Sequence, residues 1–402
     1  MKDLERFVES HAIRLPEALA GADPDLLKPL DARLADADVV SLGEFNHFNH
    51  EKSDFRLFCG KYLLSRGWRA FAEELGWSDG WRIDRFLRTG DEGEFERLPS
   101  FGYEAHLRAD RDDRPGGILK VDSYPSAEFV AEQRRFYFAL RERAGGEGAR
   151  LFGIDIDGLP GGSYEDIAQQ IAECGMGKEA AALRAALARV KGETAVEEAA
   201  RLRRARALVR SHWPPDIAAA LDALSESLEY IALTYTAQSY DAVRPGMAFR
   251  ERAMRRRLKE ARRILGTHRF VVMGHALHLA KNDRDIRGSG IGPGGGLEPS
   301  LGHSLVQRDG EKVVSIWLLY GSGEDCQPLK SLPRTANFPA DTLNARLGAF
   351  GSALLFFPSD ALELFERPFR IGQIYNSVFE TTLANQADAV VFLPQISPLR
   401  TA

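Results

Sequence analysis

The chain has 402 residues, of which 44% are hydrophobic and 28% are charged, a balance typical of a globular protein with a sizeable buried core. Its formal net charge of -5 argues against nucleic acid as a partner. No apolar run is long enough for a membrane span or a secretory signal, and the 3 cysteines lie far apart, so we expect a cytoplasmic protein without a disulfide framework.

Four short apolar runs along the chain each end in acidic or histidine side chains. They are DADVVSLGEFNH, ending at Glu44 and His47; GWRAFAEELGW, ending at Glu73 and Glu74; ARLFGIDIDGL, ending at Asp155 and Asp157; and HRFVVMGHALH, ending at His275 and His278. Their β-branched and aromatic residues are typical of buried strands. Because α/β sheets bind ligands at the carboxyl ends of parallel strands, we expect these polar ends to converge on one crevice.

The segment 160–265, between the third and fourth strands, is rich in alanine, leucine, glutamate and arginine, which are strong helix formers. Its apolar residues recur at helical spacing, which predicts a helical insert that forms one wall of the active-site cleft. The chain has no internal repeat and no low-complexity linker. We therefore predict a single α/β domain over residues 1–402, with a central, largely parallel sheet flanked by helices.

A glycine-rich segment follows the fourth strand. GIGPGG (290–295) matches a dinucleotide-binding fingerprint, but it does not directly follow a strand, so a mobile loop over the crevice is expected instead. Further on, LVQRDGEKVVSIWLLYGSG predicts a hairpin with an Asp-Gly turn. ALLFFPSD and ADAVVFLPQ predict the last strands of the sheet.

The histidines and acids of these motifs are compatible with a metal site. Two histidine pairs with a spacing of three residues can combine with two nearby glutamates as ligands: His47, His50, His275, His278, Glu44 and Glu74. The segment HFNHE, however, has neither the H-E-x-x-H nor the H-x-x-E-H order of known zinc hydrolases. The sequence thus leaves metal binding open, on a weak local motif.

The same residues are compatible with general-base catalysis. A carboxylate from Glu44 or Glu74 can orient His47 and raise its basicity, so that His47 takes a proton from water as the water attacks a carbonyl. His275 or His278 can then stabilise the oxyanion or protonate the leaving group. A nucleophilic serine is not expected, because the chain has no G-x-S-x-G motif.

Some of these residues also have ordinary structural interpretations. His50 is equally compatible with a hydrogen-bonded structural role. Asp155 and Asp157 are expected to cap the helix that follows them rather than to act in catalysis. The histidines outside the four motifs are interpreted as ordinary: His11, His106, His212, His268 and His303.

Taken in order, the motifs resemble the erythromycin esterase-like family, whose members are labelled erythromycin esterase or succinoglycan biosynthesis protein. The matching segments are GEFNHFNHE, EELGW, LFGIDIDG, RERAM (250–254), GHALH and ADAVVFLPQISPL, which span nearly the whole chain. The resemblance places the catalytic histidine on His47, its partner glutamate on Glu44 and an arginine on Arg56. It places the remaining site residues on Glu74, His275 and His278.

The resemblance implies hydrolysis of an ester or lactone in a small-molecule substrate, with water activated by His47 and with no metal or other cofactor. The residues expected to act in catalysis are His47, Glu44, Glu74 and His275. The residues expected to bind the substrate are Arg56, His278, Arg250 and Phe48.

Four positions depart from the family pattern. Asn46 replaces a threonine, Phe48 replaces a glycine, Glu251 replaces an aspartate and Ala276 replaces an asparagine. Phe48 puts bulk beside His47, so another ester or acyl substrate is expected in place of a large macrolide.

Three other functions remain open at the level of sequence. The first is a biosynthetic cyclase or rearranging enzyme that uses the same His/Glu base without adding water. The second is a metal-dependent hydrolase that uses the same residues as ligands. The third is a binding protein that has kept the fold and lost activity.

Overall fold

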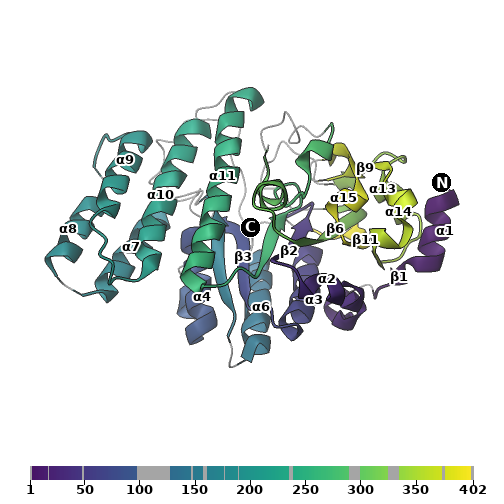
Figure 1. Cartoon of the computed structure of the whole chain (residues 1–402), viewed down its shortest axis with the longest axis horizontal. Coiled ribbons are helices and arrows are strands. Elements are labelled where there is room, and N and C mark those ends of the chain that lie inside the picture. Colours follow the sequence, from purple (N-terminus) through teal and green to yellow (C-terminus); the bar gives the residue numbers. More distant parts are fainter. Residues whose placement is uncertain are drawn as a thin grey trace. The chain divides into compact units, whose positions relative to one another are not determined.

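The computed structural model describes residues 2–16, 18–47, 49–96, 127–145, 148–156, 161–175, 177–188, 190–234, 239–288, 299–324, 335–373 and 376–399. Figure 1 shows the chain coloured from its first residue to its last. It divides into two compact units. Unit 1 comprises Met1–Phe71, Asp122–Arg150 and His268–Ala402, and unit 2 comprises Ala72–Val121 and Leu151–Thr267.

A largely parallel sheet forms the centre of unit 1. Its strand order is β1-β8-β11-β6-β2-β5, and β7 pairs with β6. The neighbours β11, β6, β2 and β5 run parallel, whereas β1, β7 and β8 pair in antiparallel fashion. The strands are β1 (Ile13–Arg14), β2 (Val39–Glu44), β5 (Phe270–His275), β6 (Val313–Glu324), β7 (Thr335–Asn337), β8 (Leu354–Phe356) and β11 (Ala389–Ile396). The predicted α/β class with a largely parallel sheet is confirmed.

Helices accompany this sheet in unit 1. They are α1 (Lys2–His11), α2 (Asp31–Ala35), α3 (His50–Ser65), α6 (Ala127–Ala144), α12 (Leu301–His303), α13 (Leu343–Gly348), α14 (Leu362–Phe365) and α15 (Leu383–Gln386), together with a two-stranded hairpin of β9 (Pro368–Gly372) and β10 (Val378–Thr382). The central strands are apolar on both faces, as parallel strands in such folds are. In β2, for example, Val39, Val40 and Leu42 are completely buried.

Unit 2 is mainly helical. After β3 (Ala70–Gly76) come α4 (Trp77–Thr89) and α5 (Gly93–Glu96), and after β4 (Arg150–Asp155) come five helices. These are α7 (Gly161–Glu173), α8 (Lys178–Leu187), α9 (Ala195–Arg206), α10 (Pro215–Thr234) and α11 (Tyr240–Leu265), and they occupy the segment expected to be a helical insert. α10 packs against both α9 and α11, and the three lie side by side in Figure 1.

One element predicted from the sequence differs in the structure. The expected hairpin around Asp309 and Gly310 is wrong, because the first arm is helical. Ser300 caps α12 by accepting a hydrogen bond from the His303 amide, and residues Ser304–Arg308 continue as a π-helical turn. The second arm is β6, whose neighbours are β2, over residues 313–318, and β11, over residues 316–323, and not the segment before Asp309. The last two predicted strands are present as β8 and β11.

Candidate active site

Glu44, His47 and Arg56 come together at the carboxyl end of β2. Glu44 is the last residue of β2. The distance from His47 Nδ1 to Glu44 Oε1 is 3.1 Å. Arg56 on α3 donates from Nη2 to the same oxygen at 3.2 Å. The side chains of Glu44 and Arg56 are 0% and 3% exposed, whereas that of His47 is 26% exposed. A buried carboxylate therefore orients an imidazole that solvent can reach.

The charges around Glu44 keep it ionised. Burial alone would raise its pKa, but the Arg56 guanidinium and the hydrogen bond from His47 lower the pKa to about 2, from an ordinary value of 4.5. An ionised carboxylate only accepts hydrogen bonds, so the neutral His47 ring carries its hydrogen on Nδ1. Nε2 is then the nitrogen of His47 that can take up a proton.

The second oxygen of the Glu44 carboxylate, Oε2, differs from Oε1 in its hydrogen bonding. Glu44 Oε2 is buried and has no hydrogen-bond partner among the residues that the structure describes. A buried charged acceptor without a partner is costly, and such atoms tend to mark functional positions. Glu44 Oε2 is therefore a candidate acceptor for a water or a substrate group.

His275 lies beside His47 because β5 runs parallel to β2. The register pairs Glu44 with His275, and the Ala276 amide donates to the Glu44 carbonyl oxygen at 2.8 Å. The rings of His47 and His275 have their centroids 5.2 Å apart. The Leu277 amide donates to His275 Nδ1 at 3.3 Å, so the hydrogen of the neutral His275 ring is on Nε2. His275 thus presents an N–H donor within the same cluster.

His278 completes the histidine cluster. It follows His275 by one turn, with its amide donating to the His275 carbonyl oxygen at 3.0 Å. The two rings meet edge to face with centroids 6.2 Å apart, and both are buried. On another side Phe45 packs edge-on against His275 at 5.8 Å, so the cluster has an apolar support.

The close approach of β2 and the residue after β5 depends on glycine. An alanine at Gly43 would place a Cβ 3.0 Å from both Ala276 Cα and Cβ and 3.1 Å from Trp317 Cδ1. Gly43→Ala is expected to lower the free energy of unfolding by about 1–3 kcal/mol, as measured by urea denaturation. Gly21→Ala is the matched control, since its Cβ would meet nothing within 4 Å. Equal stability of the two variants would contradict this packing argument.

Glu74, Asp155 and Arg250 form a second charged cluster, in unit 2. Arg250 donates from Nε to Asp155 Oδ1 at 2.7 Å and from Nη2 to Glu74 Oε1 at 2.6 Å. Burial alone would lower the pKa of Arg250, but Asp155 and Glu74 raise it well above its ordinary value. The sequence predicts that Asp155 caps the helix that follows it, but this prediction is wrong. That helix, α7, begins only at Gly161, and the Asp155 carboxylate binds Arg250 instead.

The structure also gives a role to His50. It is the first residue of α3, and its Nδ1 pairs with Glu132 of α6. Sequence reasoning missed Glu132, because nothing in the segment AEQRRF distinguishes it from a surface glutamate. Phe48, Asp157 and the glycine-rich segment 290–295 lie outside the described residues.

Two further observations concern ligands and membranes. Within the described ranges, no group of three or more histidine, cysteine, aspartate or glutamate side chains is arranged to hold a metal ion. In that same part of the chain, no helix has the length and apolar character that a membrane crossing requires.

Comparison with known proteins decides the family. The model of the erythromycin esterase family matches residues 64–396. The chain belongs to the erythromycin esterase family. Membership of this family supports a hydrolase-type function at the level of class. The match includes Glu74, His275 and His278 but begins after Glu44, His47 and Arg56.

Solved structures similar to this family member show the same fold. A succinoglycan biosynthesis protein is 17% identical, with a TM-score of 0.70 over 99% of this chain and 97% of that chain. A protein from Bacillus cereus is 16% identical, with a TM-score of 0.71 over 99% and 98% of the two chains. A variant of the erythromycin esterase EreC in its open conformation is 18% identical, with a TM-score of 0.60 over 95% and 97%. No curated protein matches the sequence.

Proposed function

We propose that this protein hydrolyses an ester or lactone of a small-molecule substrate, with His47 as the general base and Glu44 as its positioning partner. The observation that carries the proposal is the hydrogen bond from His47 Nδ1 to the buried Glu44 carboxylate. It fixes the tautomer in which Nε2 accepts a proton, and it stabilises the imidazolium that forms. Family membership supports the same class of reaction.

The reaction proceeds in two proton-balanced steps. A water molecule attacks the ester carbonyl carbon, and its proton moves to His47 Nε2 as the new C–O bond forms. The carbonyl oxygen becomes an oxyanion, which accepts a hydrogen bond from His275 Nε2–H. When the intermediate collapses, the bond to the alcohol oxygen breaks and the imidazolium returns its proton to that oxygen. The products are an acid and an alcohol, with one water added.

Arg56 serves this mechanism as a positioning residue. Sequence resemblance assigned it to substrate binding, but its hydrogen bond to Glu44 supports a role in holding that carboxylate ionised and in place. A guanidinium remains charged at every pH at which the protein folds. Arg56 therefore keeps an ionised carboxylate beside the nitrogen of His47 that it orients.

His275 and His278 are expected to differ in their effects on kinetics. His275→Ala removes the donor to the oxyanion, which exists only after attack, so kcat should fall by about a hundred- to a thousandfold with little change in KM. His278→Ala is the matched control for removing a buried histidine from the same turn, and it should act mainly on KM, as a substrate-binding residue does. Steady-state kinetics of both variants separate the roles. A higher KM with an unchanged kcat in His275→Ala would refute the assignment of His275 to the oxyanion.

The experiment that tests the function is a product-mass screen. The protein is incubated with a panel of macrolides, lactones and simple esters in the presence of a chelator. The proposal predicts a product heavier by one water from at least one ester or lactone, and no effect of the chelator, because no step requires a metal. A product of unchanged mass would favour the cyclase alternative, and activity that the chelator abolishes would favour the metal-dependent one.

A further inference from the structure

A cavity of about 370 Å³ lies in unit 2, between α4, α7 and the start of α10, and the function proposed above does not use it. Its volume is within the range of small-molecule binding sites. The lining combines two indoles with charged and amide side chains: Trp81, Arg85, Arg88, Gln170, Glu173, Cys174, His212, Trp213, Pro214 and Asp216.

Gln170 provides the observation that points to a ligand. The residue lines the cavity and is only 6% exposed. Its Oε1 is buried and has no hydrogen-bond partner among the described residues. Leaving a buried amide oxygen without a partner destabilises the fold, so such a group is expected to be satisfied by something that binds in the cavity.

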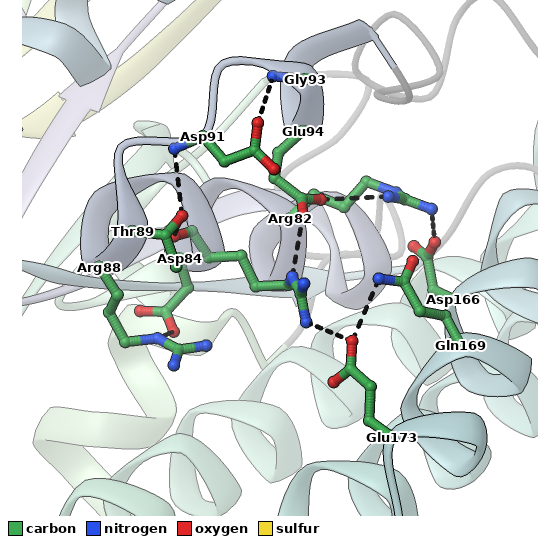
Figure 2. Close-up of polar contacts among 11 residues, drawn as sticks. Arg82, Asp84, Arg88, Thr89, Asp91, Gly93, Glu94, Asp166, Gln169 and Glu173 are labelled. Carbon is green, nitrogen blue, oxygen red and sulfur yellow. Dashed lines mark hydrogen bonds and ion pairs between the residues drawn. The ribbon is translucent and has the colours of Figure 1, made fainter.

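The arginine beside this amide is held rigidly. Arg85 donates from Nε to Glu94 Oε1 at 2.9 Å and from Nη1 to Glu173 Oε1 at 2.8 Å, and its guanidinium lies 4.9 Å from the centre of the Trp81 ring. Figure 2 shows the network around Glu94 and Glu173, in which Gln169 also donates to Glu173 at 3.2 Å. Groups fixed in this way recognise a ligand at a low cost in conformational entropy.

The charges of the lining balance. Arg85 and Arg88 carry two positive charges, and Glu173 and Asp216 carry two negative charges. A ligand of either sign would therefore meet a like charge, which favours a neutral molecule. Trp213 is half-buried, so part of its indole can contact a ligand with an apolar face.

We propose that this cavity binds a neutral sugar ring. The C–H face of a pyranose is apolar and stacks on an indole, while its hydroxyl groups both donate and accept hydrogen bonds. Guanidinium groups, an amide and carboxylates supply the complementary donors and acceptors in one place. Trp213 provides the stacking surface, Gln170 Oε1 accepts from one hydroxyl, and Arg85 donates to another.

The test is ¹⁹F NMR of the full-length protein labelled with 5-fluorotryptophan, titrated with neutral methyl glucopyranoside and methyl galactopyranoside. The chain has 5 tryptophans, and Trp213→Phe assigns the resonance of interest. We expect saturable shifts of the Trp213 signal, with a dissociation constant on the order of millimolar for at least one glycoside. Trp213→Ala and Gln170→Leu should each weaken binding about tenfold, as measured by calorimetry.

Gln169→Leu is the matched control, because Gln169 precedes Gln170 on α7 but does not line the cavity, and Arg85 still holds Glu173 in that variant. Its affinity should equal that of the wild type. Absence of saturable binding of either glycoside would overturn the proposal. So would binding that survives both cavity substitutions but is lost in His47→Asn, which would place the sugar at the histidine cluster. Tighter binding of methyl glucuronide than of the neutral glycosides would overturn the assignment of a neutral ligand.

Discussion

Replacing His47 by asparagine is expected to lower kcat/KM for ester hydrolysis by about a hundred- to ten-thousandfold, the range by which a general base accelerates such a reaction. Asparagine keeps a donor near Glu44 Oε1 but has no nitrogen that takes up a proton from water. Because asparagine keeps a donor beside the Glu44 carboxylate, the thermal unfolding midpoint should fall by much less than it does in Glu44→Gln. The kinetics and the unfolding midpoint are measured on the same preparation.

His50→Asn is the matched control for this variant. His50 is a histidine of the same segment that also pairs with a glutamate, Glu132 of α6. It is not part of the Glu44–His47–Arg56 arrangement, so its substitution should leave kcat/KM within about threefold of the wild type. An equal loss of activity in the two variants would mean that the segment tolerates no change and that His47 has no special role.

Replacing Glu44 by glutamine is expected to affect both activity and stability. The change keeps the shape of the side chain but removes the negative charge that faces Arg56, whose side chain is only 3% exposed. Removing one partner of this buried ion pair should lower the free energy of unfolding by about 3–5 kcal/mol. Activity should also fall, because the amide no longer fixes His47 as a hydrogen-bond donor at Nδ1.

This stability difference should depend on pH. The pKa of Glu44 is about 2 in the folded protein and near 4.5 ordinarily, so its carboxylate contributes fully above about pH 4.5. The contribution is lost as the pH falls toward about 2. The difference in the free energy of unfolding between wild type and Glu44→Gln, measured by urea denaturation, should therefore become smaller from about pH 6 to about pH 3.

Glu51→Gln is the control for this experiment. Glu51 also lies on α3, but it is partly exposed, and among the described residues its hydrogen bonds come from Ser397, so a small loss of stability is expected. If the difference in the free energy of unfolding between wild type and Glu44→Gln stayed constant over this pH range, the ionised and buried state of Glu44 would be contradicted.

The strands that carry the histidine cluster could be predicted from the sequence. Their apolar runs are short and almost uninterrupted, and the predicted strand ends coincide with β2 at Glu44 and β5 at His275. The convergence of their polar ends was expected from the parallel arrangement, and the register that pairs these two residues agrees with it. Local sequence was sufficient here because the carboxyl ends of neighbouring parallel strands lie at the same edge of the sheet, so the polar residues that follow the two strands come together.

The partners of several side chains could not be predicted. Asp155 resembles a helix cap in sequence, but Arg250, which is distant along the chain, binds it instead. Likewise, the pairing of His50 with Glu132 depends on how α3 packs against α6. The Asp-Gly turn at Gly310 is a genuine local signal, with a positive φ of 71°, yet the arm before it is helical. Such outcomes are set by tertiary packing and not by the local pattern.

If the Glu44–His47 pair adds water to a carbonyl carbon, hydrolysis in heavy-oxygen water must place the label in the acid product. Wild type and His47→Asn are incubated with the ester or lactone identified by the product-mass screen, and the products are weighed by mass spectrometry. We expect one heavy oxygen in the acid product of the wild type and almost no product from the variant. A product without heavy oxygen, or labelled product formed equally fast by His47→Asn, would contradict it.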